Sequence, residues 1–401
     1  MKISEKMNQC TLSPMRKYYP LVVKAENEGK RIYPLNIGQP DLPTPPEFMQ
    51  AVRSIDEKTL AYAPSPGMPV LIQAIRKYYE KLDVSLTAED VLITTGGSEA
   101  LLFTCLSILD PGSEVIVPEP YYSNYGTFIR AAGGVVRPLP TRPEEGYRYA
   151  DRQRLVELIN PNTRAIMITN PGNPTGVVLN DGEMRLIADV AKEYGLYLIS
   201  DEVYREFCYN DSDSIPCMGR FSDIDENLVI IDSVSKRFSS CGARIGCVIT
   251  KNKELQQAVL KLCQSRLSVA TLDQIGAAAL YSVEDSYIKD SIREYRRRRD
   301  VTIAGLKNIP GVVVEAPMGA FYVMAKLPVD DADKFQQWLL TDFEDRMETV
   351  TFAPGASFYG TPGSGYNEIR IAYVLKETDL QRAMELMKMG IARYRKEVMG
   401  V

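Results

Sequence analysis

Residues 233–246 read SVSKRFSSCGARIG, and the rest of the chain is best understood by working outward from them. They follow an apolar run, Leu228 to Ile231, whose length and β-branched residues predict a buried strand. Lys236 and Arg244 therefore lie just past a strand end, among serine hydroxyls. An amine, hydroxyl donors and a fixed cation are what is needed to hold a phosphorylated aldehyde as an imine. On these residues alone, an ordinary polar surface loop remains an open alternative.

The composition is that of an ordinary globular protein. The chain has 401 residues, enough for two domains, with 45% hydrophobic and 25% charged residues. Its net charge of -5 gives no overall attraction to nucleic acid or to anionic membranes. It contains no histidine, which excludes histidine metal sites and histidine-dependent triads and leaves proton transfer to lysine, tyrosine, cysteine or a carboxylate.

The N-terminus, the apolar runs and the cysteines all bear on the cellular compartment of the protein, and they agree with one another. The N-terminus, Met1 to Lys6, has charges where a signal peptide needs an apolar segment, and no apolar run is long enough to span a bilayer. The seven cysteines contain no Cys-x-x-Cys pair, which favours reduced thiols over a disulfide framework. We therefore expect a cytoplasmic protein.

Strand-like runs that end in polar or glycine-rich turns recur through the middle of the chain. They lie at 91–94, 114–117, 165–169, 196–200 and 228–231, with helical patterns between them. This alternation predicts a mostly parallel sheet with helices on both faces. Such sheets bind ligands outside the carboxyl ends of their strands. The residues that fall there are Gly96, Tyr122, Asn173, Asp201 and Lys236.

Other features lie outside this sheet. Gly38 and Tyr62 stand in proline-rich turns, and Arg370 lies on a strand of a smaller α+β unit near the C-terminus. The four arginines at 296–299 are expected on a solvated helix face or in salt bridges between subunits. We expect three parts: an N-terminal arm that joins the small domain (1–45), a large domain (46–286) and a small C-terminal α+β domain (287–401).

With these motifs in this order, the sequence resembles that of the class I aminotransferases. They are the aspartate-aminotransferase-like group of fold type I pyridoxal phosphate enzymes. The resemblance covers nearly the whole chain, and its most specific parts are Asn170 to Gly176, Asp201-x-x-Tyr204, and Ser233-x-Ser235-Lys236 with Arg244-x-Gly246. It implies an α/β fold, with a mostly parallel seven-stranded sheet between helices in the large domain, plus a smaller α+β domain. It also implies pyridoxal 5'-phosphate as cofactor and a homodimer with shared active sites.

The resemblance implies roles around the cofactor ring. Lys236 would form the Schiff base and carry the proton in the reaction. Asp201 would pair with the pyridine nitrogen, and Tyr204 with Asn173 would bind the phenolic oxygen. Tyr122 would stack on the ring face.

It implies further roles at the phosphate and the substrate. Arg370 would bind the α-carboxylate of the substrate as a bidentate fork, with Gly38 and Asn173 beside it. Tyr62 would reach the phosphate of the neighbouring subunit. Within one subunit the phosphate would be held by Gly96, Gly97, Ser98, Ser233, Ser235 and Arg244.

The implied reaction is transfer of an amino group between an L-amino acid and a 2-oxo acid. The donor is open, because many bacterial aspartate-specific relatives have a Lys that helps bind the second carboxylate where this chain has Ser98. A lyase or synthase that eliminates a β or γ substituent on the same scaffold is the alternative. A cofactor-binding regulator is disfavoured, since the matching region begins too early to leave room for a DNA-binding domain.

Overall fold

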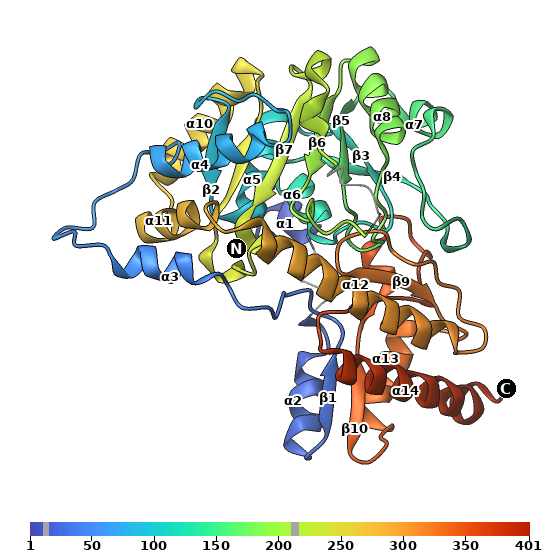
Figure 1. The fold of residues 1–401 in the computed structure, drawn as a ribbon. Coiled ribbons are helices and arrows are strands. Elements are labelled where there is room, and N and C mark those ends of the chain that lie inside the picture. Colours follow the sequence, from blue (N-terminus) through green and yellow to red (C-terminus); the bar gives the residue numbers. More distant parts are fainter. Residues whose placement is uncertain (11–15, 210–215) are drawn as a thin grey trace.

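The computed structural model describes residues 1–10, 16–209 and 216–401, and its larger part is built on a seven-stranded sheet (Figure 1). The strand order is β2-β8-β7-β6-β5-β3-β4. The five strands from β7 to β4 are parallel, whereas β8 runs antiparallel to both of its neighbours. The strands are β2 (Val91–Thr94), β3 (Glu114–Pro118), β4 (Val135–Leu139), β5 (Thr163–Thr169), β6 (Tyr197–Asp201), β7 (Leu228–Ser233) and β8 (Gly246–Ile249). The predicted α/β class with a mostly parallel seven-stranded sheet is confirmed.

Helices cover both faces of this sheet, because successive strand residues point to opposite sides. On β7, Ile230 belongs to one apolar core, whereas Val229 and Ile231 belong to the other. The first core is closed by α3 (Pro46–Arg53), α4 (Pro69–Glu80), α7 (Arg152–Leu158), α8 (Asp181–Glu193) and α11 (Thr271–Leu280). The second is closed by α5 (Gly96–Ile108), α6 (Asn124–Ala131) and α10 (Lys253–Arg266).

The smaller part lies below the large sheet in Figure 1 and has its own core. It joins the two ends of the chain, because β1 (Arg31–Pro34) pairs in parallel with β10 (Glu348–Thr351). A three-stranded antiparallel sheet has the order β11 (Ala353–Pro354), β12 (Glu368–Ala372), β9 (Tyr322–Lys326). Its helices are α2 (Tyr19–Asn27), α12 (Asp285–Lys307), α13 (Ala332–Thr341) and α14 (Glu377–Tyr394).

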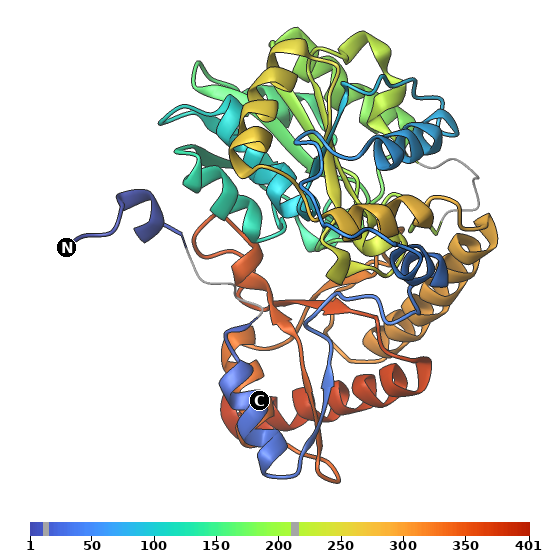
Figure 2. The same cartoon turned by 90° about the vertical axis from the view of Figure 1, so that its left-hand side faces the viewer.

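The short helix α1 (Glu5–Asn8) lies apart from α2, at the outer edge of the molecule (Figure 2). There the Lys6 ammonium donates a hydrogen bond of 3.3 Å to the Ala131 carbonyl, at the end of α6. The N-terminal segment thus contacts the large part before the chain enters the small one.

The antiparallel strand β8 brings two charged groups to one edge of the sheet. Strand β7 ends at Ser233, and Lys236 follows in the short helix α9 (Val234–Arg237). Because β8 returns beside β7, with Ser233 opposite Gly246, Arg244 is held at the same edge as Lys236. Gly246 also lies opposite Thr94, so the N-terminus of α5 joins them there.

Two features differ from the sequence expectations. Strands β4 and β8 were not expected: β4 contains Arg137 and Pro138, and β8 begins with a glycine and has only two β-branched residues, so neither gives a clear strand pattern. The expectation for the arginine run is wrong for Arg298, which is 3% exposed and pairs within the chain with Asp41 at 2.6 Å and Glu294 at 2.8 Å. A helix of period 3.6 turns one of four consecutive residues inward.

In the described part of the chain, we find no helix with the length and apolar character needed to cross a membrane.

Candidate active site

One cavity of about 520 Å³ at the carboxyl edge of the sheet gathers most of the predicted site residues. It is bordered by segments from the large sheet, the N-terminal arm and the small part. The predicted residues that line it are Gly38, Gly97, Ser98, Tyr122, Asn173, Asp201, Tyr204, Ser233, Ser235, Lys236, Arg244 and Arg370. Of the other two, Gly96 lies directly behind Arg244, whereas Tyr62 lies outside the cavity and is 80% exposed.

Asp201, the last residue of β6, forms the floor of the cavity. Its carboxylate accepts a hydrogen bond of 2.5 Å from the Tyr125 hydroxyl and a longer one, 3.4 Å, from the Val203 amide. Burial raises the pKa of Asp201 to about 6, despite these hydrogen bonds. A protonated ring nitrogen placed here would give this carboxylate the cation it lacks.

Lys236 extends from α9 into the centre of the cavity. Its amine donates a hydrogen bond of 3.0 Å to the Gly38 carbonyl and lies 3.6 Å from the Cys241 sulfur. The side chain therefore reaches from the sheet edge to the N-terminal arm, across the space where a ligand has to lie. Lys236 is the one lysine among the described residues that line this cavity.

The end of the cavity predicted to take the phosphate, called the phosphate end below, is built closely around Arg244. Its backbone is left-handed, with φ of 53°, and its Nη1 donates to the Cys241 carbonyl at 2.9 Å. Gly96 has φ of 73°, and a Cβ there would lie 2.2 Å from Arg244 Nη2. Only glycine tolerates both this positive φ and this close approach of the arginine without strain. The Arg244 guanidinium thus lies against the start of α5, where free N–H groups and the helix dipole favour an anion.

The end of the cavity predicted to take the substrate, called the substrate end below, is built around Arg370 on β12. The side chain is buried, and its guanidinium donates to Asn173 Oδ1 at 3.0 Å and to the Asn36 carbonyl at 2.6 Å. Burial lowers the pKa of Arg370 below its usual value. A buried guanidinium favours a carboxylate partner, and its planar fork matches the two oxygens of that group. This position corrects the outward-facing orientation that is the default for an arginine on a strand.

Tyrosines connect the two ends. The hydroxyls of Tyr204 and Tyr322 lie 2.9 Å apart, and Tyr322 also donates to the Gly38 carbonyl at 3.3 Å. Burial raises the pKa of Tyr204 well above its usual value, so its hydroxyl stays protonated and can donate. Tyr122 borders the cavity and packs edge to face on Tyr125, with ring centroids 5.5 Å apart.

Sequence reasoning missed several residues of this cavity. Arg16, Tyr322, Tyr125 and Cys241 all line it. Tyr125 and Cys241 stand within segments that the sequence singled out, so their proximity to the site was available as a signal. Arg16 and Tyr322 had none, because only the tertiary fold brings the N-terminal arm and β9 to this edge.

The donor set fits a flat, phosphorylated pyridine aldehyde. An amine stands at the centre, a buried carboxyl at the floor, and a guanidinium at a helix N-terminus. The residues present therefore suit pyridoxal 5'-phosphate on chemical grounds.

The chain is similar to known proteins over most of its length. The family model described as "Aminotransferase class I and II" matches residues 30–386. The aspartate aminotransferase of Pyrococcus horikoshii is 32% identical over 395 residues, which cover 97% of each chain. A (5-formylfuran-3-yl)methyl phosphate transaminase of Methanocaldococcus jannaschii is 33% identical over 92% of this chain and 94% of its own. The solved structure of the Thermus thermophilus aspartate aminotransferase with maleate superimposes with a TM-score of 0.88, at 29% identity, over 97% of this chain and 100% of the other.

Proposed function

The chain belongs to the class I and II aminotransferases, which use pyridoxal 5'-phosphate, and from this premise we propose that its amino donor carries a second anionic group. The enzyme transfers an amino group between an amino acid and a 2-oxo acid. The relatives named above are aminotransferases or transaminases by name, so the elimination chemistry of a lyase is not favoured.

The proposed roles at the cofactor follow from the cavity. When bound, the cofactor supplies an electron sink for the carbanion formed at the substrate Cα. Lys236 holds the cofactor covalently and then moves the proton, which its central position supports. Asp201 keeps the ring nitrogen protonated, Tyr204 and Asn173 bind the phenolic oxygen, and Tyr122 stacks on the ring.

The phosphate and the α-carboxylate are assigned to opposite ends of the cavity. Arg370 binds the α-carboxylate, with Gly38 and Asn173 beside the substrate, as its burial and its contact with Asn173 support. The phosphate is assigned to Gly97, Ser98, Ser233, Ser235 and Arg244, with Gly96 leaving room for the arginine.

The choice of donor rests on the position of Arg16, which lines the cavity. The charged residues lining the described part of the cavity are Arg16, Asp201, Lys236, Arg244 and Arg370. In the roles above, each of them except Arg16 already has a charged partner in the cofactor or the amino acid. The next two residues bind elsewhere, because Lys17 pairs with Asp333 at 2.6 Å and Tyr18 donates to the Asp333 carbonyl. Arg16 thus supplies the cation that Ser98 does not, toward a second carboxylate or a phosphate.

The test is the half-reaction of the cofactor-loaded enzyme with single amino acids, followed by visible absorbance and by the oxo acid formed. Matched pairs separate the second anionic group from size: aspartate with asparagine, glutamate with glutamine, phosphoserine with serine. We expect acidic members to react faster, and Arg16→Gln to lower kcat/KM for them by about tenfold while sparing the neutral members. Lys17→Gln, which removes the neighbouring cation, serves as control and should spare both. Equal losses for acidic and neutral members would overturn the choice of donor, and absence of any reaction would overturn transamination itself.

We further propose a cytoplasmic homodimer with shared sites. Two observations support an association surface on the segment before α4: Tyr62 is 80% exposed and Leu60 is 62% exposed. All seven cysteines are free thiols, which suits a reducing compartment. Light scattering of the purified protein tests the dimer, and Tyr62→Ala should weaken cofactor binding if this ring reaches the phosphate of the other subunit.

The division into an arm (1–45), a large domain (46–286) and a small domain (287–401) is likewise proposed. The pairing of β1 with β10 supports placing the arm with the small domain. Limited proteolysis with mass analysis of the fragments tests these boundaries.

A further inference from the structure

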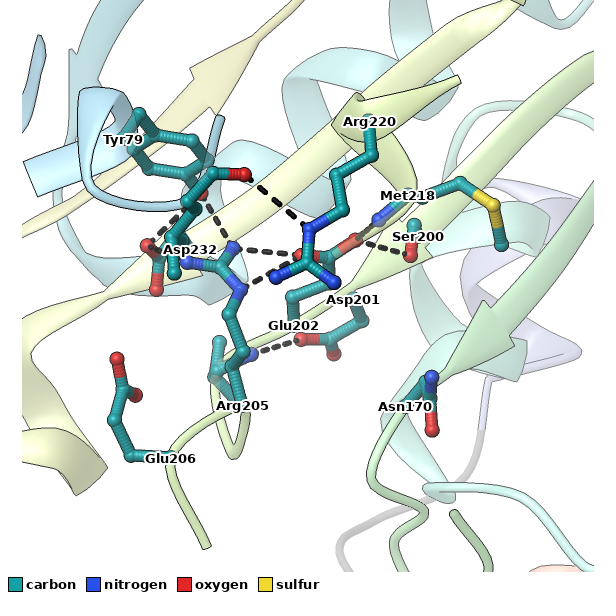
Figure 3. A network of polar contacts seen from close by, with 12 residues as sticks. Tyr79, Asn170, Ser200, Asp201, Glu202, Arg205, Glu206, Met218, Arg220 and Asp232 are labelled. Atoms are coloured by element: carbon teal, nitrogen blue, oxygen red, sulfur yellow. Dashed lines mark hydrogen bonds and ion pairs between the residues drawn. The ribbon is translucent and has the colours of Figure 1, made fainter. Parts of the chain in front are cut away.

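Five buried charged side chains lie directly behind the active site, and none of them lines the cavity. Three follow β6, one lies near the end of β7 and one is in α9, and each is between 0% and 4% exposed. Figure 3 labels four of them, Glu202, Arg205, Glu206 and Asp232, near one another. We call the following set the ion-pair cluster: Glu202, Arg205, Glu206, Asp232 and Arg237.

Each arginine of the cluster binds one carboxylate on its own segment and one on the other. Arg205 pairs with Glu202 at 2.7 Å and with Asp232 of β7 at 3.5 Å. Arg237 pairs with Asp232 at 3.0 Å and with Glu206, beyond β6, at 2.8 Å. The segment after β6 and the turn after β7 are therefore joined by two ion pairs that cross between them.

Two tyrosines of α4 complete the cluster. The Tyr79 hydroxyl donates to Asp232 Oδ2 at 3.0 Å and accepts from Arg205 Nη2 at 2.5 Å, as seen in Figure 3. Tyr78 donates to Glu206, and the Arg237 guanidinium lies over its ring, 4.2 Å from the centroid. The cluster is thus anchored to a helix that packs on the sheet from outside the site.

Cluster residues alternate with active-site residues along the chain. Glu202 follows Asp201, and Arg237 follows Lys236. The same holds at two more positions, where Arg205 follows Tyr204 and Asp232 precedes Ser233. Because neighbouring residues of an extended or turning chain point to different sides, one side of each segment faces the cavity and the other faces the cluster. Any shift of the cluster therefore moves the groups that face the cofactor.

Stability alone is a poor reason for such a cluster. Removing charges from water is costly, and well-packed apolar side chains of similar volume often serve a fold at least as well. A buried network with fixed hydrogen-bond directions does specify one arrangement of its segments. Burial opposes ionisation of Asp232, yet Arg237 and Arg205 lower its pKa below the usual value, so it stays a charged partner for both.

We propose that the ion-pair cluster consists of positioning residues, which fix the turn bearing Lys236 against the segment bearing Asp201 and so set the amine relative to the cofactor ring. The inference rests on the proposed roles of Lys236 and Asp201. Arg237 links the two segments, because it donates hydrogen bonds to Asp232 and forms an ion pair with Glu206.

The experiment compares Arg237→Gln and Arg237→Lys with wild type, all loaded with cofactor. Three quantities are measured: the half-reaction rate at saturating amino acid, the dissociation constant of maleate, and the visible circular dichroism of the bound cofactor. We expect Arg237→Gln to lower the rate about 10- to 100-fold and to change the dichroism, because the ring and amine lose their fixed relation. Maleate binding should change less than about threefold, because Arg370 donates to Asn173 and Asn36 and Arg16 lies on the N-terminal arm, on segments other than those that carry the cluster. Arg237→Lys, which keeps the charge, should recover part of the rate.

Arg382→Gln is the matched control. Arg382 also bridges carboxylates, namely Glu348 at 2.6 Å, Asp345, and Glu385 at 3.2 Å, but it lies on α14, away from the cavity. It should lower the melting temperature without altering the rate or the dichroism. If Arg237→Gln behaves like this control, the cluster is only structural and the proposal is overturned.

If Arg237→Gln does not fold, a milder variant, Tyr79→Phe, tests the same proposal. Tyr79→Phe removes one hydroxyl that joins Asp232 to Arg205. We expect a two- to fivefold lower rate with a small change in dichroism, and unchanged values in a folded Tyr79→Phe protein would overturn the proposal. Failure of the proposed function is distinguishable, because wild-type protein would then show no cofactor band or no reaction with any amino acid.

Discussion

The two ends of the active-site cavity are built in different ways. At the phosphate end, Arg244 and Gly96 come from segments that meet on neighbouring strands of one sheet. At the substrate end, Arg16, Gly38 and Arg370 come from the N-terminal arm and from β12 of the small part. The phosphate end is therefore fixed by the central sheet, whereas the substrate end depends on how the small part and the arm lie against it. We therefore expect that binding of the cofactor and choice of the substrate can be changed separately.

The largest expected effect is at Lys236, where the two ends meet. We expect Lys236→Ala to lower turnover by at least about 10⁴-fold, because both the covalent link and the proton carrier are lost. Some cofactor should still bind, since the phosphate end and Asp201 are intact. Steady-state assays and cofactor retention after gel filtration check this, and a fully active variant would remove Lys236 from the mechanism.

Arg370→Gln probes the substrate end alone. We expect kcat/KM to fall by about 100-fold for every amino acid, because a buried charge pair with the α-carboxylate is lost. The dissociation constant of the cofactor should stay within about twofold, since Arg370 belongs to the other end. Titration of cofactor-free protein gives this constant. A parallel loss of cofactor affinity would show that the two ends are not separable.

In the cofactor-free protein, ionisation of Asp201 should make the stability of the fold depend on pH. Its pKa is about 6 in the fold, against about 3.9 in an unfolded chain. The folded state therefore binds more protons between these values, and stability falls as pH rises through this window, by up to about 3 kcal/mol. Relative to wild type, cofactor-free Asp201→Asn should be equally stable near pH 4 and more stable at pH 7. Urea unfolding of both proteins across this range checks it; a difference that does not vary with pH would contradict the raised pKa.

Gly96→Ala tests the phosphate end. The new methyl group would meet Arg244 and force an alanine into a left-handed conformation. We expect the cofactor dissociation constant to rise by about tenfold, with the preference among amino acids unchanged. Gly242→Ala is the control, because a Cβ there meets open space. Equal affinities in the two variants would show that the Arg244 position is not set by Gly96.

The smallest effect is expected at Tyr322, which joins the ends through Tyr204. Tyr322→Phe removes the hydrogen bonds to Tyr204 and to the Gly38 carbonyl. We expect about a threefold lower kcat, with cofactor affinity unchanged. Tyr366→Phe, at an exposed tyrosine outside the cavity, is the control for steady-state assays. A loss greater than about 30-fold would mean that Tyr322 does more than orient its neighbour.

The sequence predicted the residues at the sheet edge better than those from the N-terminal arm, for a physical reason. Residues such as Asp201 and Lys236 follow buried strands, and parallel strands end at a common edge, so their proximity can be inferred from order alone. Arg16 reaches the cavity only because the arm crosses from α6 to the small part, and no local pattern encodes that path. The burial of the five charges behind the site could not be predicted either, because the segment from Glu202 to Glu206 is rich in charged residues, which are usually exposed to solvent.

The return of β8 beside β7 also constrains how the gene can change. Ser233 and Gly246 are opposite each other in the sheet, so the turn between them has a length fixed at both ends. A residue inserted there would move Lys236 or Arg244 out of place, whatever its side chain. In a library of single-codon insertions and deletions, residues 234–245 should therefore give almost no active clones, while several side chains there remain exchangeable. We therefore expect the number of residues in this turn to matter more for activity than the identity of most of its side chains.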